Sequence, residues 1–288
     1  MESIDCIICN SSTSSIFNDS LHSDYNIVKC KCGFIYLNPR PNSLDITKYY
    51  AKEYLPHNTH NSKVYTFLQI LSFKWKYKII NKLFPNKGIH LDVGSGNNNF
   101  SNYLRSKGWK SQSYDKFSHS NINNLKKIEN KSIDLITMWH SIEHMHDIND
   151  VIESLFNKIK DNGYLLIACP NIDAFERNLF KNNWVAYDVP RHLYHFNHIT
   201  LSNYLKKNSF IINNHYPIYQ DTFFNIFLSF KYIMSKIFLY LPYLIISLCY
   251  MLLMKKQHSS YIYIYAKSIY KHIIHLLVFM SLSARFNW

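Results

Sequence analysis

The sequence from Ile89 onward predicts an α/β fold in which a parallel sheet is connected by crossover helices. Short apolar runs typical of buried strands, IHLDV, SIDLITMW and GYLLIAC, alternate with helical patterns over residues 98–107 and 147–160. Such alternation is typical of parallel strands joined through helices. A glycine-rich turn follows the first run, where open α/β sheets bind ligands. A chain of 288 residues with 47% hydrophobic side chains is long enough to bury such a sheet.

The glycine turn lies in LDVGSGNNNF, residues 91–100, directly after the first strand. Gly94 and Gly96 have no side chain to separate the backbone from a ligand, and both tolerate a positive φ. Asp92 is placed to accept a hydrogen bond from an amino group of that ligand, through the backbone or a water molecule. Asp115 ends the next strand-like run, WKSQSYD, where an acidic side chain can bind a ribose hydroxyl. The turn lacks the third glycine of GxGxxG, which argues against a nicotinamide dinucleotide.

The order of four motifs, LDVGSG, YD, SIDLITMWHSIEHMHD and GYLLIACPN, resembles that of class I S-adenosylmethionine-dependent methyltransferases over residues 88–215. The resemblance implies a Rossmann-like sheet and S-adenosylmethionine as the cofactor, with the glycine turn at the methionine moiety and the acidic residue of YD at the ribose. The residues that it implies for the cofactor pocket are Asp92, Gly94, Gly96, Asp115, Met138, Trp139 and His140. The alternative is a tight structural turn whose aspartate is satisfied at the surface.

A histidine-rich stretch, WHSIEHMHD, begins at the end of the strand SIDLITMW. A helical spacing would put His140 and His144 on one face, where they could bind a metal ion. The order HSIEH differs from the HExxH of zinc proteases. In the family that the sequence resembles, this stretch begins a helix beside the cofactor, and Glu143 and His144 would form hydrogen bonds there. We therefore expect packing or cofactor shaping ahead of catalysis.

A second cluster of polar and aromatic residues, NNWVAYDVPRHLYHF, covers residues 182–196. Convergent donors around an apolar floor are typical of a substrate pocket, and the segment resembles the PRHLYHF motif of one methyltransferase subgroup. The predicted substrate-binding residues are Trp184, Arg191 and Tyr194, and the predicted catalytic residues are His192 and His195. Either histidine, when neutral, could remove the proton of an acceptor hydroxyl. The alternative is a structural clamp in which Arg191 pairs with Asp188 and the histidines are hydrogen-bonded.

Four of the six cysteines form two close pairs near the start of the chain, Cys6 with Cys9 and Cys30 with Cys32. Four thiolates can hold one tetrahedral zinc ion and so order a segment too small to form its own core. The pattern resembles the zinc-ribbon-like start of the same methyltransferase subgroup, including the FIYLNPRP that follows, although the second pair is C-x-C. Free structural thiols are the alternative, and a redox C-x-x-C would leave the second pair unexplained.

The composition divides the chain into five parts. They are a zinc-ribbon-like cysteine module (1–42), a connecting helical segment (43–86), a methyltransferase core (87–221), an apolar helical insertion (222–258) and a last strand with a C-terminal tail (259–288). The strand candidates FIINNHYPIYQ and YIYIYAKS flank the insertion and must pair in one sheet. We therefore expect the insertion to be a helical hairpin or interfacial pair bent near Pro242, lying on a membrane or forming a lid or dimer surface.

The net charge of +13, from 32 Lys and Arg against 19 Asp and Glu, favours a polyanionic partner. An anionic membrane surface is expected rather than nucleic acid, because the apolar insertion lacks interleaved basic residues. No signal-peptide pattern begins the sequence, so we expect a cytoplasmic protein at the inner face of the membrane. The resemblance implies O-methylation of a sugar or lipid-linked glycan acceptor. The alternatives are an RNA methyltransferase and a catalytically silent cofactor-binding or scaffold protein.

Overall fold

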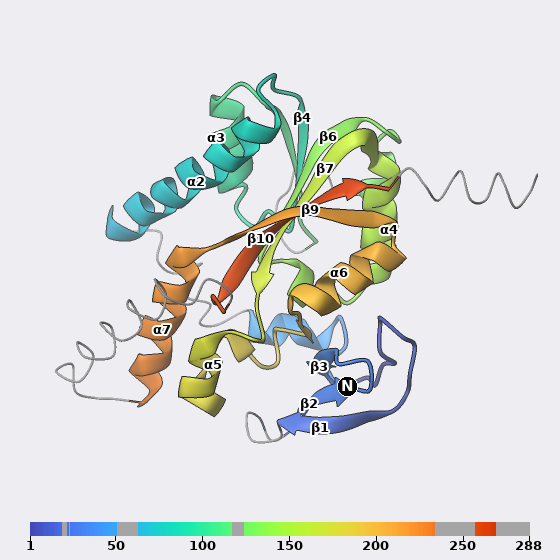
Figure 1. Cartoon of the computed structure of the whole chain (residues 1–288), viewed down its shortest axis with the longest axis vertical. Helices are drawn as coiled ribbons and strands as arrows, with labels where there is room; N and C mark the ends of the chain where they lie inside the picture. The colour runs from blue at the N-terminus through green and yellow to red at the C-terminus, as the bar shows by residue number, and fades with distance from the viewer. Residues whose placement is uncertain (19–21, 23, 51–62, 117–123, 234–256, 269–288) are drawn as a thin grey trace, which may run out of the picture.

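A six-stranded sheet lies at the centre of the computed structural model, which describes residues 1–18, 22, 24–50, 63–116, 124–233 and 257–268 (Figure 1). The strands of this sheet are β4 (Ile89–Val93), β5 (Lys110–Tyr114), β6 (Ile133–Trp139), β7 (Ile159–Pro170), β9 (Phe210–Pro217) and β10 (Ser260–Lys267). Their order is β5-β4-β6-β7-β10-β9. The first four pair in parallel, whereas β10 runs antiparallel to both β7 and β9. The predicted α/β fold is confirmed.

The last two strands pair with each other, as the sequence analysis required. Tyr263 of β10 lies opposite His215 of β9 and, on the other side, opposite Ile167 of β7. Because β10 has a neighbouring strand on each side and helices above and below, its side chains are buried with little alternation.

The sheet has a topological switch point at β4, because the next strand along the chain, β5, lies on one side of β4 and the following strand, β6, lies on the other. Ligands of open α/β sheets bind outside the carboxyl ends of the strands at such a switch point. The glycine turn leaves β4 at this point. The fold therefore puts the turn where the sequence analysis expected a ligand.

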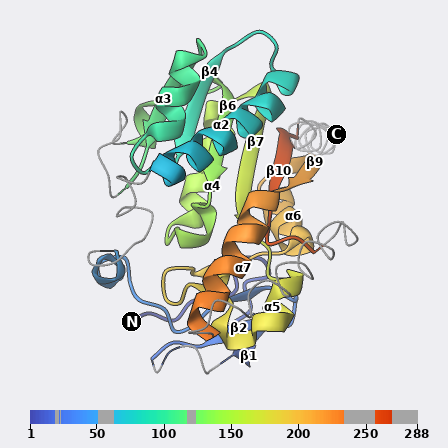
Figure 2. The ribbon, with the colours of Figure 1, turned by 90° about the vertical axis from the view of Figure 1, so that its left-hand side faces the viewer.

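Helices cover both faces of the sheet, with α2 (Lys63–Leu83) and α3 (Asn99–Ser106) on one face and α4 (Ile148–Lys158) and α6 (His198–Lys207) on the other (Figures 1 and 2). Apolar side chains recur at helical spacing on the inner side of each helix. On α4 the buried apolar residues are Ile148, Val151, Ile152 and Leu155. Residues that α2 and α3 bury against the strands include Ile80, Phe100 and Leu104.

A second, smaller sheet joins the start of the chain to its middle. It has the order β1-β2-β3-β8, with β1 (Ser14–Asn18), β2 (Ile27–Cys30), β3 (Ile35–Leu37) and β8 (Tyr194–His195). Ile35 lies opposite His195, and Tyr36 lies opposite Tyr194. The PRHLYHF segment thus supplies the fourth strand of the cysteine module, and one continuous core of buried residues connects the module with the large sheet.

The remaining helices are short or lie at the periphery. They are α5 (Phe175–Phe180), α7 (Tyr219–Ile233) and the 3-10 turns η1 (Asp45–Tyr49), η2 (Leu125–Lys127), η3 (Ile142–His144), η4 (Lys181–Asn183) and η5 (Val185–Tyr187). Within the described part of the chain, no helix is both long enough and apolar enough to cross a membrane. The predicted bend near Pro242 and most of the apolar insertion lie outside the described residues.

Candidate functional site

Glycine is needed at the two positions of the turn after β4 for different structural reasons. Both have a positive φ, +72° at Gly94 and +51° at Gly96, which L side chains rarely adopt. A Cβ at Gly94 would lie 2.3 Å from Cβ of Ser141, so this glycine is required by close packing against the loop after β6. A Cβ at Gly96 would meet no atom within 4 Å among the described residues. Gly96 therefore has room at its Cβ position among the described residues, which suits a ligand cradle.

Asp115 lies directly beside this cradle. The backbone N–H of Gly96 donates to Oδ2 of Asp115 at 2.8 Å, and the N–H of Gly94 donates to the carbonyl of Tyr114 at 2.8 Å. The pairing of β4 with β5 brings the two strand ends together. A partly exposed carboxylate next to bare backbone fits the ribose diol of S-adenosylmethionine, because a carboxylate accepts hydrogen bonds from adjacent hydroxyls.

Asp92 faces the interior instead of the cradle. Its Oδ1 accepts a hydrogen bond from Thr137 Oγ1 at 2.6 Å, and its Oδ2 accepts one from Ser101 Oγ at 3.4 Å. Burial raises the pKa of Asp92 to about 6. The side chain fixes the base of the turn, and any contact of Asp92 with a ligand would run through the backbone.

His90 continues this network beneath the turn. Its Nε2 lies 2.8 Å from Thr137 Oγ1, and its Nδ1 lies 2.7 Å from Ser111 Oγ. Because Thr137 donates its single proton to Asp92, His90 Nε2 donates to Thr137, and Nδ1 accepts from Ser111. Burial lowers the pKa of His90 to about 3. The ring is neutral and links β4, β5 and β6.

The network predicts an unusual pH dependence of stability. Below pH ~6.5 the unfolded chain binds a proton at His90 that the folded chain does not, so stability falls by up to ~1.4 kcal/mol per pH unit as pH falls. Asp92 opposes this loss from pH ~6 to ~4, where its carboxyl is protonated only in the folded chain. Urea unfolding should therefore show Asp92→Asn losing stability more steeply than wild type over that range, and His90→Asn less steeply. Equal slopes in all three proteins would contradict this assignment.

Of the three residues expected to form the pocket floor, Met138 has its side chain fully buried in the core. Trp139 and His140 are partly exposed. Trp139 packs edge-on against Phe100 at 5.2 Å between ring centroids, and Lys76 Nζ lies 4.3 Å from the Trp139 centroid. Met138 lies inside β6, whereas Trp139 ends the strand and His140 begins the loop after it, at the edge of the sheet.

His140 forms an ion pair that the sequence did not predict. Its Nε2 lies 2.8 Å from Oδ2 of Asp221, at the start of α7, and its Nδ1 lies 3.5 Å from Oε1 of Glu143. Burial lowers the pKa of His140, but the two carboxylates outweigh it and raise that pKa to about 10. Imidazolium at this position connects the loop after β6 to α7.

The expectation that His140 and His144 share one helical face is wrong. His140 has a φ of +50° and precedes the helical turn, which is the 3-10 turn η3 and not an α-helix. His144 turns instead toward the PRHLYHF segment, where its ring packs against His192 at 4.6 Å between centroids. Burial lowers the pKa of His144 to about 4.

The 182–196 segment contains the ion pair of the clamp interpretation. Arg191 Nε donates to both carboxylate oxygens of Asp188, at 2.9 and 3.0 Å, and Nη2 donates to Oδ1. His192 Nδ1 donates to the carbonyl of Ala186 at 2.8 Å. Trp184 is buried and packs edge-on against Tyr187 at 5.1 Å. Hydrogen bonds and aromatic packing thus fix the conformation of the segment, and both Arg191 and Trp184 take part in these structural contacts.

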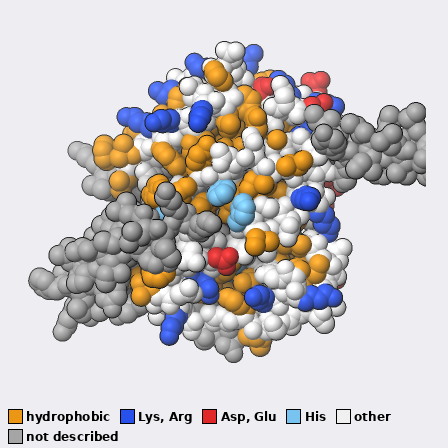
Figure 3. Space-filling view, in the orientation of Figure 1, with side chains coloured by type: hydrophobic (Ala, Val, Ile, Leu, Met, Phe, Trp, Pro, Cys, Tyr) orange, Lys and Arg blue, Asp and Glu red, His pale blue; other side chains and the backbone are white. Residues whose placement is uncertain are grey.

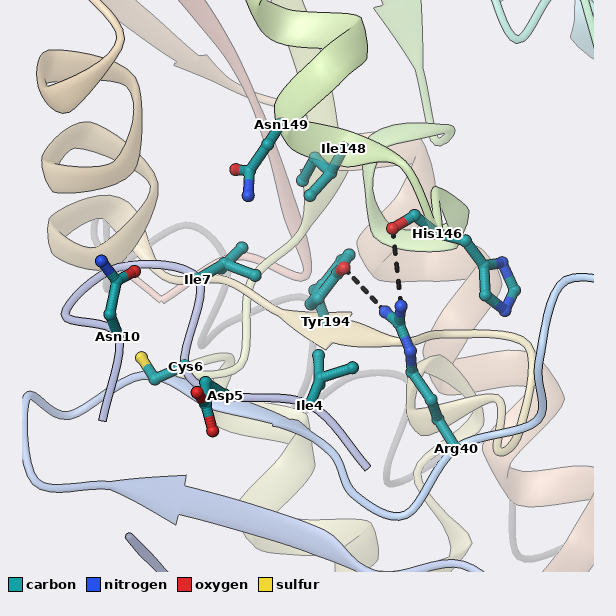
Figure 4. Close-up of a pocket in the computed structure, with 10 residues that line it drawn as sticks. All are labelled: Ile4, Asp5, Cys6, Ile7, Asn10, Arg40, His146, Ile148, Asn149 and Tyr194. Carbon is teal, nitrogen blue, oxygen red and sulfur yellow. Dashed lines mark hydrogen bonds between the residues drawn. The ribbon is translucent and has the colours of Figure 1, made fainter. Parts of the chain in front are cut away.

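Tyr194 and His195 point to opposite faces of β8, as successive residues of a strand do. Tyr194 Oη accepts from Nη1 of Arg40 at 2.8 Å, and Nη2 of Arg40 lies 3.5 Å from the carbonyl oxygen of His146 (Figure 4). Tyr194 lines a cavity of about 290 Å³ between the cysteine module and α4. Trp184 and Arg191 are not among the residues that line this cavity.

His195 lies on the other face of β8, buried with its Nε2 lacking a hydrogen-bond partner among the described residues. Burial lowers the pKa of His195 to about 3, so the ring is neutral. Its ring packs edge-on against Tyr187 at 5.8 Å and lies 6.4 Å from that of His192. A neutral imidazole with an unused ring nitrogen can accept a hydrogen bond from a bound hydroxyl.

The four N-terminal cysteines converge. The Sγ atoms of Cys6, Cys9, Cys30 and Cys32 all lie within 4.8 Å of one another. Cys6 Sγ is 3.5 Å from Cys32 Sγ, and Cys9 Sγ is 3.4 Å from Cys30 Sγ, too far for disulfides. Tetrahedral zinc with Zn–S bonds of ~2.3 Å separates its sulfur ligands by ~3.8 Å. The donor set and spacing fit zinc, even though the second pair is C-x-C.

Several residues of the site had no signal in the sequence. Thr137 and Ser101 look like ordinary polar residues of a strand and a helix until the fold puts both beside Asp92. Lys76 is one of several lysines in α2. Asp221 offered a weak signal, since it is the acidic residue in the first turn of an otherwise apolar helix.

The match to a protein-family model agrees with this geometry. A methyltransferase domain model matches residues 68–212, half of the chain. A SAM-dependent methyltransferase from Archaeoglobus fulgidus is 18% identical with a TM-score of 0.45, covering 70% of this chain and 100% of that chain. The Burkholderia thailandensis 1,6-didemethyltoxoflavin-N1-methyltransferase is 9% identical with a TM-score of 0.49, covering 89% of this chain and 99% of that chain. No curated protein matches the sequence significantly.

The family match runs from α2 to β9 and so includes the glycine turn, Asp115 and the loop after β6. The strand order, the bare backbone at Gly96 and the carboxylate beside it fit the cofactor of that family. The chain therefore belongs to the methyltransferase domain family and is a class I S-adenosylmethionine-dependent methyltransferase.

Proposed function

We propose that the enzyme transfers the methyl group to a hydroxyl oxygen of a sugar or lipid-linked glycan, with His195 and His192 at the acceptor. The observation that carries this proposal is that Nε2 of the buried His195 has no hydrogen-bond partner within the described part of the chain. Leaving a buried polar atom unpaired costs ~1–3 kcal/mol, and a bound hydroxyl would remove that cost. S-adenosylmethionine, when bound, supplies the electrophilic methyl group.

Backbone contacts link the cofactor turn to these histidines. Ser141 packs against Gly94 and donates from Oγ to the carbonyl of Val93 at 2.9 Å. Two residues later, the carbonyl of Glu143 accepts from the backbone N–H of Leu193 at 2.8 Å. The loop after β6 thus lies between the cofactor turn and the PRHLYHF segment. This arrangement supports the proposal that Asp115 and the turn bind the cofactor and that His195 binds the acceptor.

His195→Gln tests the acceptor role. We expect kcat/KM for the acceptor to fall ~100-fold or more, because a positioned histidine at a reacting hydroxyl contributes that much, while the Kd of S-adenosylmethionine stays unchanged. His198→Gln replaces an exposed histidine nearby and is the matched control. Turnover of His195→Gln at the wild-type rate would make His195 structural.

The acceptor class is tested with labelled S-adenosylmethionine and separate host extracts of glycans, lipids and RNA. Label in a glycan or glycolipid, at an ether methyl by NMR, is the expected result. Transfer to RNA, lost at high salt, would establish the rival RNA methyltransferase. Cofactor binding by calorimetry without transfer to any extract would establish the silent scaffold.

We also propose that the four cysteines hold a structural zinc ion. Their spacing supports it, and so does the small size of the module, whose strands β1 to β3 have three to five residues each. Four thiolate ligands would fill the coordination sphere of the ion and leave no position for water or substrate. The role of the ion would therefore be to order the module.

The proposed site of action is an anionic membrane surface. On α7, Phe224 and Phe227 are 53% and 62% exposed, and on α2, Phe67 is 60% exposed. Figure 3 shows hydrophobic side chains interspersed with basic ones on the part of the visible face that carries α2. Exposed aromatic side chains with neighbouring lysines suit a headgroup region.

Flotation with anionic liposomes tests the membrane proposal. Phe224→Ser combined with Phe227→Ser should weaken partitioning at least tenfold, because burying one phenylalanine stabilises binding by ~1.5–3 kcal/mol. Ile199→Ser removes an equally exposed apolar residue from α6 and should leave flotation unchanged. Equal flotation of the double variant and wild type would argue for a lid or dimer surface.

A further inference from the structure

A second group of metal-ligand atoms lies between the loop after β6 and the PRHLYHF segment. Glu143, His144 and His192 each offer one ligand atom, and the three atoms lie within 4.8 Å of one another. Glu143 and His144 come from η3, whereas His192 comes from the turn that follows Asp188. Glu143 and His192 are buried, and His144 is partly buried. This group is separate from the four cysteines.

The hydrogen bonds fix the tautomers of both imidazoles. His192 Nδ1 lies 2.8 Å from the carbonyl oxygen of Ala186. His144 Nδ1 lies 3.0 Å from the carbonyl oxygen of Arg191 and 3.0 Å from Oη of Tyr50, which can accept from the same N–H. A carbonyl oxygen only accepts, so each Nδ1 carries the proton and each Nε2 keeps its lone pair. Metal-binding histidines characteristically donate the other ring N–H to a carbonyl or carboxylate, which orients the ring. Both rings have this second contact in place.

Glu143 lacks the partners that a buried carboxylate normally has. Its side chain is 1% exposed, and neither oxygen has a hydrogen-bond partner among the described residues. The charged group nearest to it in the described chain is His140, with Nδ1 at 3.5 Å from Oε1, and His140 is already paired with Asp221. Burying a charge without hydrogen bonds costs several kcal/mol, so a further cation at this carboxylate would stabilise the folded chain.

We propose that Glu143, His144 and His192 bind a divalent transition-metal ion of the zinc type. Two imidazoles and one carboxylate are a ligand set found in metal sites that have three protein ligands. Such sites keep a further coordination position for water or substrate. Metal–ligand bonds of ~2.0–2.2 Å place the ligand atoms ~3.4 Å from one another. Side-chain rotations that move each ligand atom by about 1 Å would bring the three atoms to that spacing. The softer four-thiolate cluster and this site would differ in ligand chemistry and in spectrum.

The metal site would change the assignment of His192 in the proposed function. As a ligand through Nε2, His192 could not take a proton from the acceptor. His195, whose Nε2 has no partner among the described residues, would remain for that contact. The ion would also tie the PRHLYHF segment to η3, beside Ser141 and the glycine turn. The inference rests on the proposed function only for this role, because metal binding is measured without turnover.

The competing arrangement is an imidazolium. Oδ2 of Asp188 lies 3.7 Å from Nε2 of His192, so a protonated His192 would pair with Asp188 and Glu143 without any metal. Asp188, however, already accepts three hydrogen bonds from Arg191. A protonated Nε2 would bind no metal, which makes the two arrangements distinguishable by metal content.

The test counts metal in the full chain. Wild type and variants are loaded with Zn²⁺, dialysed against metal-free buffer and analysed for zinc per chain. Glu143→Gln and His192→Gln should each contain one zinc fewer than wild type, whereas the exposed control His198→Gln should match wild type. Cys9→Ser should lose the zinc of the cysteine cluster and the second zinc as well, because the order of β8 beside His192 depends on the cysteine module.

Co²⁺ loading identifies which site is lost. Thiolate charge-transfer absorption should persist in Glu143→Gln and His192→Gln and disappear in Cys9→Ser. Far-UV circular dichroism checks that each variant is folded. If one of the two single variants misfolds, the zinc content of the other still tests the proposal. Equal zinc content in wild type, Glu143→Gln and His192→Gln would overturn the proposal and leave the imidazolium arrangement.

Discussion

Replacing Gly94 with alanine is expected to abolish measurable S-adenosylmethionine binding and to lower the stability of the fold. Alanine at a φ of +72° costs ~1–2 kcal/mol of backbone strain. Its Cβ would also lie 2.3 Å from Cβ of Ser141, and relieving such overpacking costs a further ~1–3 kcal/mol. Ser141 holds the carbonyl of Val93, so the relief moves the turn itself. Calorimetric titration and thermal unfolding measure the two effects.

Gly96→Ala is the matched comparison. Its φ of +51° imposes a similar strain, but its Cβ would meet no atom of the described residues within 4 Å. We therefore expect Gly96→Ala to be more stable than Gly94→Ala by the overpacking cost, yet to bind the cofactor at least tenfold more weakly than wild type, because the new methyl group occupies the cradle. Unchanged cofactor affinity in Gly96→Ala would mean that the cofactor does not lie against this glycine.

The cofactor half of the site could be predicted from the sequence because its determinants are local. A glycine turn directly after a strand and an aspartate at the end of the next strand become neighbours in any parallel sheet where those strands pair. The pairing of β4 with β5 fulfils this, and Asp115 contacts Gly96 as a result. Even the left-handed Asn98, with a φ of +60°, follows from local chemistry, since asparagine tolerates that conformation.

The acceptor half could not be predicted, because its contacts join distant parts of the chain. Nothing in IYL or LYHF indicates that β3 pairs with β8, or that Arg40 donates to Tyr194. The segment PRHLYHF reads as one cluster, but its two strand residues, Tyr194 and His195, face opposite sides. The helical spacing applied to HSIEH failed for the same reason, since a left-handed His140 and a 3-10 turn are set by packing against other elements.

The shared sheet has a consequence for how the two ends of the chain cooperate. Residues 194 and 195 form β8 only while β3 offers its edge, and the same core includes Phe34, Tyr36 and Phe196. His195 is therefore positioned by the cysteine module together with the loop after β6, whose Glu143 carbonyl accepts from Leu193. The order of the module and the geometry of the proposed acceptor site are expected to be lost together.

Removing zinc from the cysteine cluster should consequently abolish turnover while sparing the cofactor. Cys9→Ser is the cleanest change, because Cys9 is exposed and its replacement leaves no cavity. Structural zinc sites in small domains contribute on the order of 10 kcal/mol of binding free energy to folding, far more than three short strands can replace. We expect β1 to β3 to lose their protection in hydrogen exchange, together with β8, whereas β4 to β7 keep theirs.

The readouts separate this prediction from general unfolding. S-adenosylmethionine should bind Cys9→Ser within a few-fold of the wild-type Kd, because the glycine turn and Asp115 belong to the large sheet, while kcat falls at least ~100-fold as His195 loses its position. Cys169→Ala, at a buried cysteine of β7 outside the cluster, should keep wild-type zinc content and protection of β8. If Cys9→Ser kept both its protection pattern and its turnover, the four cysteines would be free structural thiols. The module would then be held by its apolar core, by its pairing with β8 and by the hydrogen bond from Arg40 to Tyr194.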